Sequence, residues 1–179
     1  VTHKSVRAGA FEADLPTIIS HVSLRSPILG RDFKTAQQFT KNPVKITLPG
    51  PLTIADSIAN NFYDDPKKMG ADLAEALNKE VLALAEAGCA YIQVDEPVFA
   101  RETAAALAFG FENLERIFFG LPSGVTRVVH MCCGYPTAID SNLFRKADKD
   151  AYFTIADTIE DSSIQEISFE DAHRHNELS

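Results

Sequence analysis

Residues 126–136 read Thr126-Arg-Val-Val-His130-Met-Cys132-Cys-Gly-Tyr-Pro136, an apolar run that ends in a polar turn. The run Thr126–Val129 is typical of a buried β-strand, and the glycine and proline that follow favour a turn. In an extended segment, side chains two residues apart face the same side, so His130 and Cys132 can turn toward one point. We therefore expect a strand whose carboxyl end presents an imidazole and a thiol.

Similar strands recur along the chain and alternate with helical patterns. A proline at Pro66 and a glycine at Gly88 bracket the clearest helix, whose apolar residues recur every three or four positions. The alternation predicts βαβ units and a parallel sheet. The expected strands are Thr17–Leu24, Val44–Leu48, Ala90–Val94, Thr126–Met131 and Ile164–Phe169, and the other expected helices run from about Asp32 to Phe39, Thr53 to Asn60, Val98 to Phe119 with a break near Gly110, and Asp148 or Asp150 to Ile159.

Polar residues follow several of these strands at their carboxyl ends. A doubly wound sheet and a (β/α)8 barrel both place chemistry there, but a doubly wound sheet does so mainly at one switch point. Polar ends on consecutive strands therefore favour the α/β class of the TIM-barrel type. About five strand–helix units are visible where a barrel needs about eight, so we expect residues 1–179 to form a single domain, the central part of a barrel, incomplete at both ends.

Composition narrows the class of function. The chain has 179 residues, of which 45% are hydrophobic, and a net charge of −8. This charge argues against nucleic acid as the main partner, and no apolar run is long enough to predict a membrane span. Three cysteines and no visible secretory leader predict a cytoplasmic protein rather than a disulfide framework.

His130 and Cys132 have two interpretations. They are half of a tetrahedral zinc site, since zinc accepts imidazole and thiolate ligands, or His130 caps a strand and Cys132 is a small buried residue. Glu170 ends the next strand in sequence, where it could add a carboxylate ligand or form a salt bridge with Arg174. Cys89 lies at the opposite end of its strand and is expected in the core.

Asp95 and Glu96 form a carboxylate pair at another strand end. They could bind a substrate ammonium group or act as general acid or base, or they could cap the helix that begins at Pro97. One of the two is expected to face the barrel mouth and the other a neighbouring helix. Beyond this pair, Cys133 is expected to pack, and His173 and His175 to lie on a helix surface or near the site.

Four segments together resemble the catalytic domain of cobalamin-independent methionine synthases. They are Lys45-Ile-Thr-Leu-Pro-Gly-Pro-Leu-Thr-Ile54, Ile92-Gln-Val-Asp-Glu-Pro97, His130-Met-Cys132 and Ile167-Ser-Phe-Glu170. The resemblance implies a zinc-binding (β/α)8 barrel that transfers a methyl group from a methylated folate to the thiol of homocysteine, giving methionine. It implies His130, Cys132 and Glu170 as three zinc ligands, and Asp95, with Glu96 beside it, at the site that holds the amino acid.

The chain departs from the family pattern in three respects. A distal cysteine ligand would lie beyond Ser179, and a segment that binds the substrate carboxylate would lie before Val1. The chain also has no tryptophan, and the family's pterin-stacking tryptophan falls near Ser57. Two alternatives therefore stay open: alkyl transfer or lyase chemistry on another thiol, of the coenzyme M type, and an inactive barrel fragment that self-associates through open sheet edges.

Overall fold

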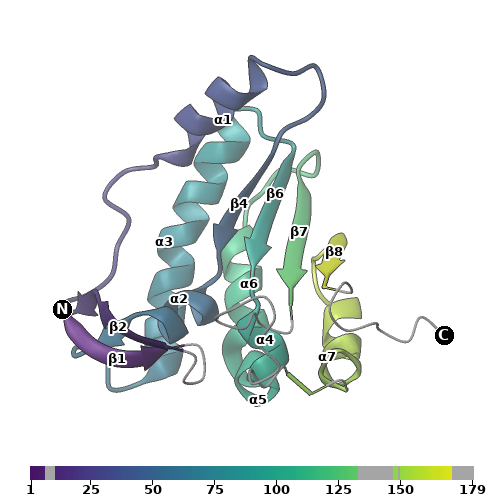
Figure 1. Ribbon diagram of the computed structural model, residues 1–179. Helices are drawn as coiled ribbons and strands as arrows, with labels where there is room; N and C mark the ends of the chain where they lie inside the picture. Colours follow the sequence, from purple (N-terminus) through teal and green to yellow (C-terminus); the bar gives the residue numbers. More distant parts are fainter. Residues whose placement is uncertain (7–10, 133–146, 149, 171–179) are drawn as a thin grey trace.

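The computed structural model describes residues 1–6, 11–132, 147–148 and 150–170. Its main sheet has four strands in the order β4 (Lys45–Pro49), β6 (Tyr91–Asp95), β7 (Thr126–Met131) and β8 (Glu166–Phe169). Each neighbouring pair is parallel. The arrowheads of β4, β6 and β7 in Figure 1 therefore point to one end of the sheet, where α2 and α4 lie.

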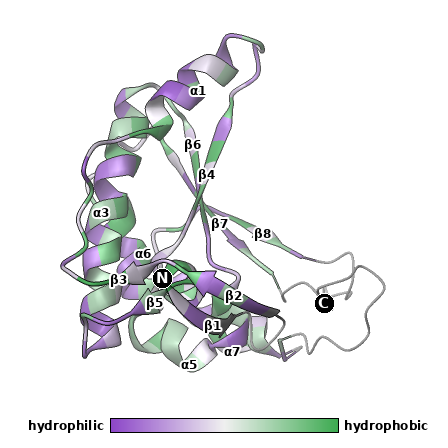
Figure 2. Ribbon diagram, turned by 60° about the vertical axis from the view of Figure 1, so that its left-hand side comes forward, coloured by the Kyte–Doolittle hydropathy of each residue, from purple (hydrophilic) through white to green (hydrophobic). Residues whose placement is uncertain are grey.

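Helices connect the strands and cover one face of the sheet. Figure 2 shows α1 and α3 along one side of the strands. The helices and their bounds are α1 (Leu29–Gln37), α2 (Pro51–Ser57), α3 (Pro66–Glu86), α4 (Val98–Arg101), α5 (Thr103–Ala105), a π-helical turn (Ala106–Gly110), α6 (Phe111–Phe118) and α7 (Ala151–Glu160).

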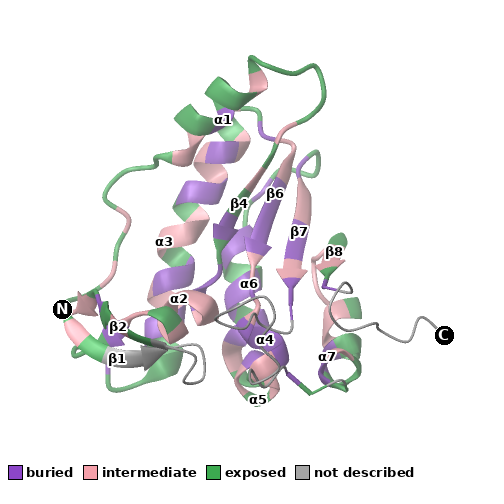
Figure 3. Cartoon of the chain, viewed as in Figure 1, coloured by how far each residue is buried: buried purple, intermediate pink, exposed green. Residues whose placement is uncertain are grey.

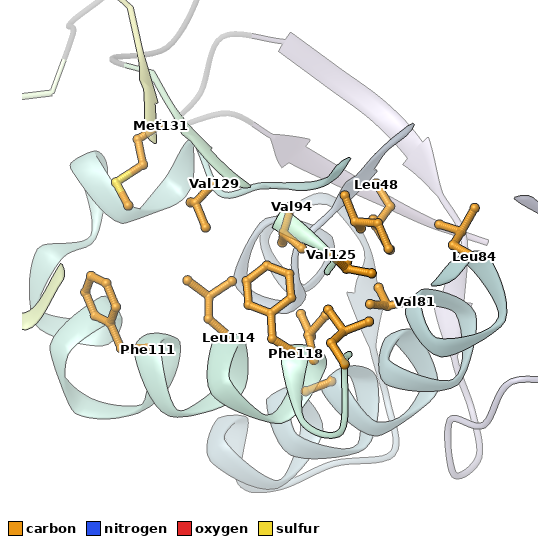
Figure 4. Packing of buried hydrophobic residues seen from close by; sticks show 14 of the residues in the cluster. Leu48, Val81, Leu84, Val94, Phe111, Leu114, Phe118, Val125, Val129 and Met131 are labelled. Carbon is orange, nitrogen blue, oxygen red and sulfur yellow. The ribbon is translucent and has the colours of Figure 1, made fainter. Parts of the chain in front are cut away.

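The hydrophobic core lies between the sheet and these helices. Alternate residues of β6 and β7, among them Val94 and Val129, are fully buried on the helix side. Figure 4 shows them packed opposite Val81 of α3 and Leu114 of α6. The buried colouring of β6 and of one side of α3 in Figure 3 follows the same layer. The intervening strand residues, which include Asp95, face the other side of the sheet.

Local signals at the ends of α3 agree with the sequence prediction. The Asp65 side chain accepts a hydrogen bond from the Lys67 N–H at 2.9 Å, and Pro66 takes the first helical position. After the helix, Gly88 adopts a positive φ of 97°, a conformation that costs glycine little. These signals are local in sequence, which is why the bounds of α3 could be predicted closely.

The amino-terminal part differs from the prediction. Only Thr17–Ile18 form a strand, β3, which pairs with β5 (Ala59–Asn60), so the strand predicted over Thr17–Leu24 is wrong beyond Ile18. Ile18 and Val22 instead pack on a cluster around Tyr63 beside α3, and the Val22 N–H donates to the Tyr63 hydroxyl at 2.8 Å. An antiparallel hairpin of β1 (Thr2–Val6) and β2 (Phe11–Leu15), which was not predicted, precedes this segment.

The edges of the main sheet and the length of the helices are two further features of the described residues. In the described part of the chain, β4 and β8 each pair with a single strand, so both sheet edges are open there. Within those same ranges, no helix has the length and apolarity needed to cross a lipid bilayer.

Candidate functional site

Polar side chains form a row across the carboxyl ends of three neighbouring strands. Asp95 ends β6 and pairs in register with His130 of β7, which in turn pairs with Ser168 of β8. Residues in register on parallel neighbours share a face of the sheet. The His130 Nδ1 atom lies 3.1 Å from the Ser168 hydroxyl oxygen, so these two side chains do point to the same side.

Cys132 and Glu170 come directly after the last residues of β7 and β8, Met131 and Phe169. Each follows a member of the row by two residues, so the alternation of the strand directs it to the same face. The Glu170 N–H donates to the Met131 carbonyl at 3.2 Å, which keeps the ends of β7 and β8 together. Cys132 and Glu170 are both buried. The sheet thus carries an imidazole, a thiol and a carboxyl group toward one end.

These three side chains have the chemistry of a zinc ligand set. Zinc prefers imidazole nitrogen, thiolate sulfur and carboxylate oxygen. The contact between His130 Nδ1 and Ser168 leaves Nε2 as the ring nitrogen for a metal. Among the described residues, however, no group of three or more His, Cys, Asp or Glu side chains lies close enough together to hold a metal ion. The donor types fit zinc, and a closed ligand cage is absent from the described ranges.

Asp95 belongs to a hydrogen-bonded string on the same face. Gln93, two residues earlier on β6, donates from Nε2 to Asp95 Oδ1 at 2.7 Å. Lys45 of β4 donates from Nζ to Gln93 Oε1 at 2.5 Å. Asp95 is half-buried and Gln93 is buried. A cation on one strand is therefore linked through an amide to the carboxylate beside His130.

Glu96 has a different environment, although it is adjacent in sequence to Asp95. Its side chain is fully buried and faces the amino end of α2, where Leu52 N–H and Thr53 N–H each donate to it at 3.0 Å and the Thr53 hydroxyl donates at 2.7 Å. Burial raises the pKa of Glu96 from 4.5 to about 7, because desolvation of the charge outweighs these hydrogen bonds. The carboxyl group caps a helix that belongs to another strand–helix unit.

Gly50 makes this arrangement possible. A Cβ atom at this position would lie 2.2 Å from Glu96 Oε1, so no larger residue fits without displacement. The Gly50 N–H also donates to the Asp95 carbonyl, and the Glu96 N–H donates to the His130 carbonyl, both at 2.9 Å. The carboxyl ends of β4, β6 and β7 are thus fastened together around Glu96.

Asp95 and Glu96 lie in different environments, although both were predicted to bind substrate. Asp95 lies on the face that carries His130, and Glu96 lies against a neighbouring helix, as one of the two was expected to do. Glu96 was also predicted to bind substrate together with Asp95, but its carboxyl oxygens are occupied by α2. Substrate binding by Asp95 and Glu96 stays a prediction, and the hydrogen bonds to α2 show that the Glu96 carboxyl group also holds the end of β6 against this helix.

Three residues of the site were not predicted. Gln93 and Ser168 precede Asp95 and Glu170 by two positions, and Lys45 begins the neighbouring strand. A polar Gln93 inside an otherwise apolar strand was the available signal, because a buried amide needs partners. Nothing local in the sequence distinguishes Lys45 or Ser168 from other strand residues, since their roles depend on register.

The other cysteines and histidines considered in the sequence analysis separate into two groups. Cys89 is 1% exposed beside the start of β6, and burial raises the pKa of its thiol. The prediction that Cys89 belongs to the core is confirmed. Cys133, His173 and His175 lie outside the described residues.

Comparisons with known proteins identify the family of this chain. Residues 5–111 match the family model for the cobalamin-independent synthase, catalytic domain. The chain is 35% identical over 121 residues to a methionine synthase of Saccharolobus solfataricus, a match that covers 66% of this chain and 35% of the relative. It is 27% identical over 158 residues to a methionine synthase of Thermococcus kodakarensis, covering 88% of this chain and 41% of the relative.

A solved structure extends the comparison to nearly the whole chain. The B12-independent methionine synthase from Shewanella sp. W3-18-1, in complex with selenomethionine, superposes with a TM-score of 0.86 at 28% identity, covering 98% of this chain and 51% of that one. Parallel strands with intervening helices define a partial α/β fold, and the likeness to this synthase confirms the predicted TIM-barrel class. The chain belongs to the cobalamin-independent methionine synthase family and matches its catalytic domain. It spans only about a third of the length of the first curated relatives.

Proposed function

We propose that this chain carries part of the active site of a zinc-dependent methyltransferase. The reaction would move the methyl group of 5-methyltetrahydrofolate, in its polyglutamate form, to the thiol of homocysteine, giving methionine. The observation that carries the proposal is the register that sets Asp95 beside His130 at the strand ends, with Cys132 and Glu170 one step beyond. Support also comes from curated relatives named methionine synthase and from the relative solved with selenomethionine.

His130, Cys132 and Glu170 would hold the zinc ion, with the fourth position supplied from outside the described residues. When bound, zinc lowers the pKa of a coordinated thiol, so that the thiol can lose its proton near neutral pH. Ser168 orients the His130 ring through the contact at Nδ1. The buried positions of Cys132 and Glu170 keep water away from these ligands.

Asp95 would bind the ammonium group of the amino-acid substrate. Its carboxylate lies in register with His130, so an amino acid held there has its thiol directed toward the ligand set. Glu96 and Gly50 hold the carboxyl ends of β4, β6 and β7 together. Holding the ammonium group at Asp95 and the thiol at the ligand set would fix the orientation of the substrate, which lowers the entropy cost of the transfer.

A second function has one observation in its favour. The chain has no tryptophan, which leaves the pterin ring of a folate without the aromatic partner expected near Ser57. A zinc-dependent alkyl transferase or lyase acting on another thiol, such as coenzyme M, would use the same ligands without a folate.

We further propose that residues 1–179 belong to one barrel domain, that the protein is cytoplasmic, and that the open edges at β4 and β8 allow self-association.

The test is a matrix of donors and thiols assayed with the intact gene product. Methylfolate polyglutamate with homocysteine should give methionine, and Asp95→Asn should raise the KM for homocysteine because it removes the charge that faces the ammonium group. Asp157→Asn, on the helix α7, is the matched control and should leave that KM unchanged. Turnover of coenzyme M with another alkyl donor, and none with homocysteine, would favour the second function.

A further inference from the structure

The string from Lys45 through Gln93 to Asp95 has a defined direction. The Lys45 ammonium group has only donors, and an ionised Asp95 carboxylate has only acceptors. Gln93 lies between them, with Oε1 toward Lys45 Nζ and Nε2 toward Asp95 Oδ1. The opposite amide orientation would place two donors together at one end and two acceptors together at the other. Lys45 therefore determines which group Gln93 presents to Asp95.

Burial restrains Gln93, the middle member of the string. Gln93 is 8% exposed and lies between Ile92 and Val94, which are fully buried. A buried amide loses free energy unless both its donor and its acceptor are paired, and the two partners here satisfy both. The strand pairing of β4 with β6 fixes the distance that the string must span.

The string leaves one side of the Asp95 carboxylate available. Gln93 occupies Oδ1, and within the described ranges no hydrogen bond to Oδ2 is formed. Because the bond to Oδ1 restricts rotation of the carboxylate, Oδ2 has a defined direction on the face that carries His130. A preoriented acceptor binds a cationic donor with a smaller loss of entropy than a freely rotating one.

We propose that Gln93 and Lys45 are positioning residues that hold Asp95 in the orientation that receives the ammonium group of an α-amino acid. This inference rests on the proposed function for the class of substrate, and it adds the residues that set the preference for an amino thiol over a thiol without the amine. Lys45 acts through Gln93, and Gln93 acts through Asp95. Neither residue is assigned a contact with the substrate.

The experiment measures binding, so it does not depend on turnover. Calorimetry on the intact protein compares homocysteine with 4-mercaptobutyrate, which keeps the thiol and the carboxylate but lacks the ammonium group. In Gln93→Met the affinity for homocysteine should fall by about tenfold or more, the scale of a hydrogen bond to a charged group, and the affinity for 4-mercaptobutyrate should stay unchanged. Lys45→Met should likewise lower the ratio of the affinity for homocysteine to the affinity for 4-mercaptobutyrate. Lys45→Arg, which keeps a cationic donor, should have a ratio close to that of the wild type.

Gln37→Met is the matched control for the loss of a hydrogen-bonded glutamine. Gln37 makes three hydrogen bonds to backbone groups between the end of α1 and the amino end of β4, at the opposite end of the strand from the site, so this variant should lower stability without changing the binding ratio. Equal losses for both thiols in Gln93→Met, or a wild-type protein that binds both thiols equally, would overturn the inference. Preferential binding of homocysteine without methyl transfer would contradict the proposed function and leave the inference standing.

Discussion

Replacing Glu96 with glutamine removes one of two acceptor oxygens from the most buried carboxyl group at the strand ends. The remaining oxygen can still accept from Thr53, but the new amide nitrogen then faces the Leu52 N–H and leaves it unpaired. An unpaired buried donor costs about 1–3 kcal/mol. We expect Glu96→Gln to lower the free energy of unfolding by about that amount at acid pH, where the wild-type side chain is also neutral.

The same substitution has the opposite effect as the pH rises. The pKa of Glu96 is raised by burial from 4.5 to about 7, so the folded protein binds this proton more tightly than the unfolded chain does. The stability that Glu96 contributes by this route is fully present below about pH 4.5 and is lost as the pH rises through about 7. A pKa rise of this size corresponds to about 3 kcal/mol. The glutamine does not titrate, so the wild type should lose about 3 kcal/mol relative to the variant across this range.

Urea unfolding followed by circular dichroism, at pH values from about 4.5 to about 8.5, measures this difference directly. A chelator in every sample removes any contribution from metal binding. Thr53→Ser keeps the hydroxyl donor to Glu96 and is expected to keep the wild-type pH profile. If the free energies of unfolding of the wild type and Glu96→Gln change in parallel over the whole range, the account of Glu96 as a buried carboxyl with a raised pKa is refuted.

Two further substitutions test the packing, and a third tests the cap of α3. Gly50→Ala should lower the free energy of unfolding by more than about 2 kcal/mol, because its Cβ would meet a buried carboxyl oxygen at 2.2 Å, whereas Gly124→Ala, with no atom within 4 Å of its Cβ, should change little in the same urea titration. Leu84→Ala should cost about 2–5 kcal/mol by thermal and urea unfolding, since Leu84 is 0% exposed, and a cost no larger than that of Leu107→Ala, which starts 44% exposed, would contradict the proposed core. Asp65→Ala should cost about 1 kcal/mol through loss of the cap on α3, and no change in the urea midpoint would show that the cap contributes nothing.

The part of the fold that sequence could predict is the part with local signals. The strand Thr126–Met131 has the predicted bounds, because it is an apolar run and residues typical of a turn follow it. The helix after Asp65 was predictable for the same reason, since a cap, a proline and a closing glycine lie next to it. The start of α1 was placed too late, at Asp32 rather than Leu29, because its cap comes from Glu80 on another helix, which accepts the Leu29 N–H at 2.7 Å.

In the site, too, only the residues with local signals could be predicted from the sequence. Asp95 and His130 could be selected because each ends an apolar strand. The contact of Glu96 with the start of α2 could not be predicted, because Thr53 lies far away in sequence and only the pairing of β4 with β6 brings the two together. The contact of Ser168 with His130 likewise depends on the register of β7 and β8. Contacts set by register carry no signal in a single sequence.

The central claim is that His130, Cys132 and Glu170 form part of a zinc site, and metal analysis of the intact protein tests it most directly. The account predicts about one zinc per chain, lost in Cys132→Ser and retained in Cys89→Ser, because Cys89 is a core residue beside the start of β6. A wild-type protein that transfers methyl groups without zinc, or a Cys132→Ser variant that keeps the zinc content of Cys89→Ser, would contradict it.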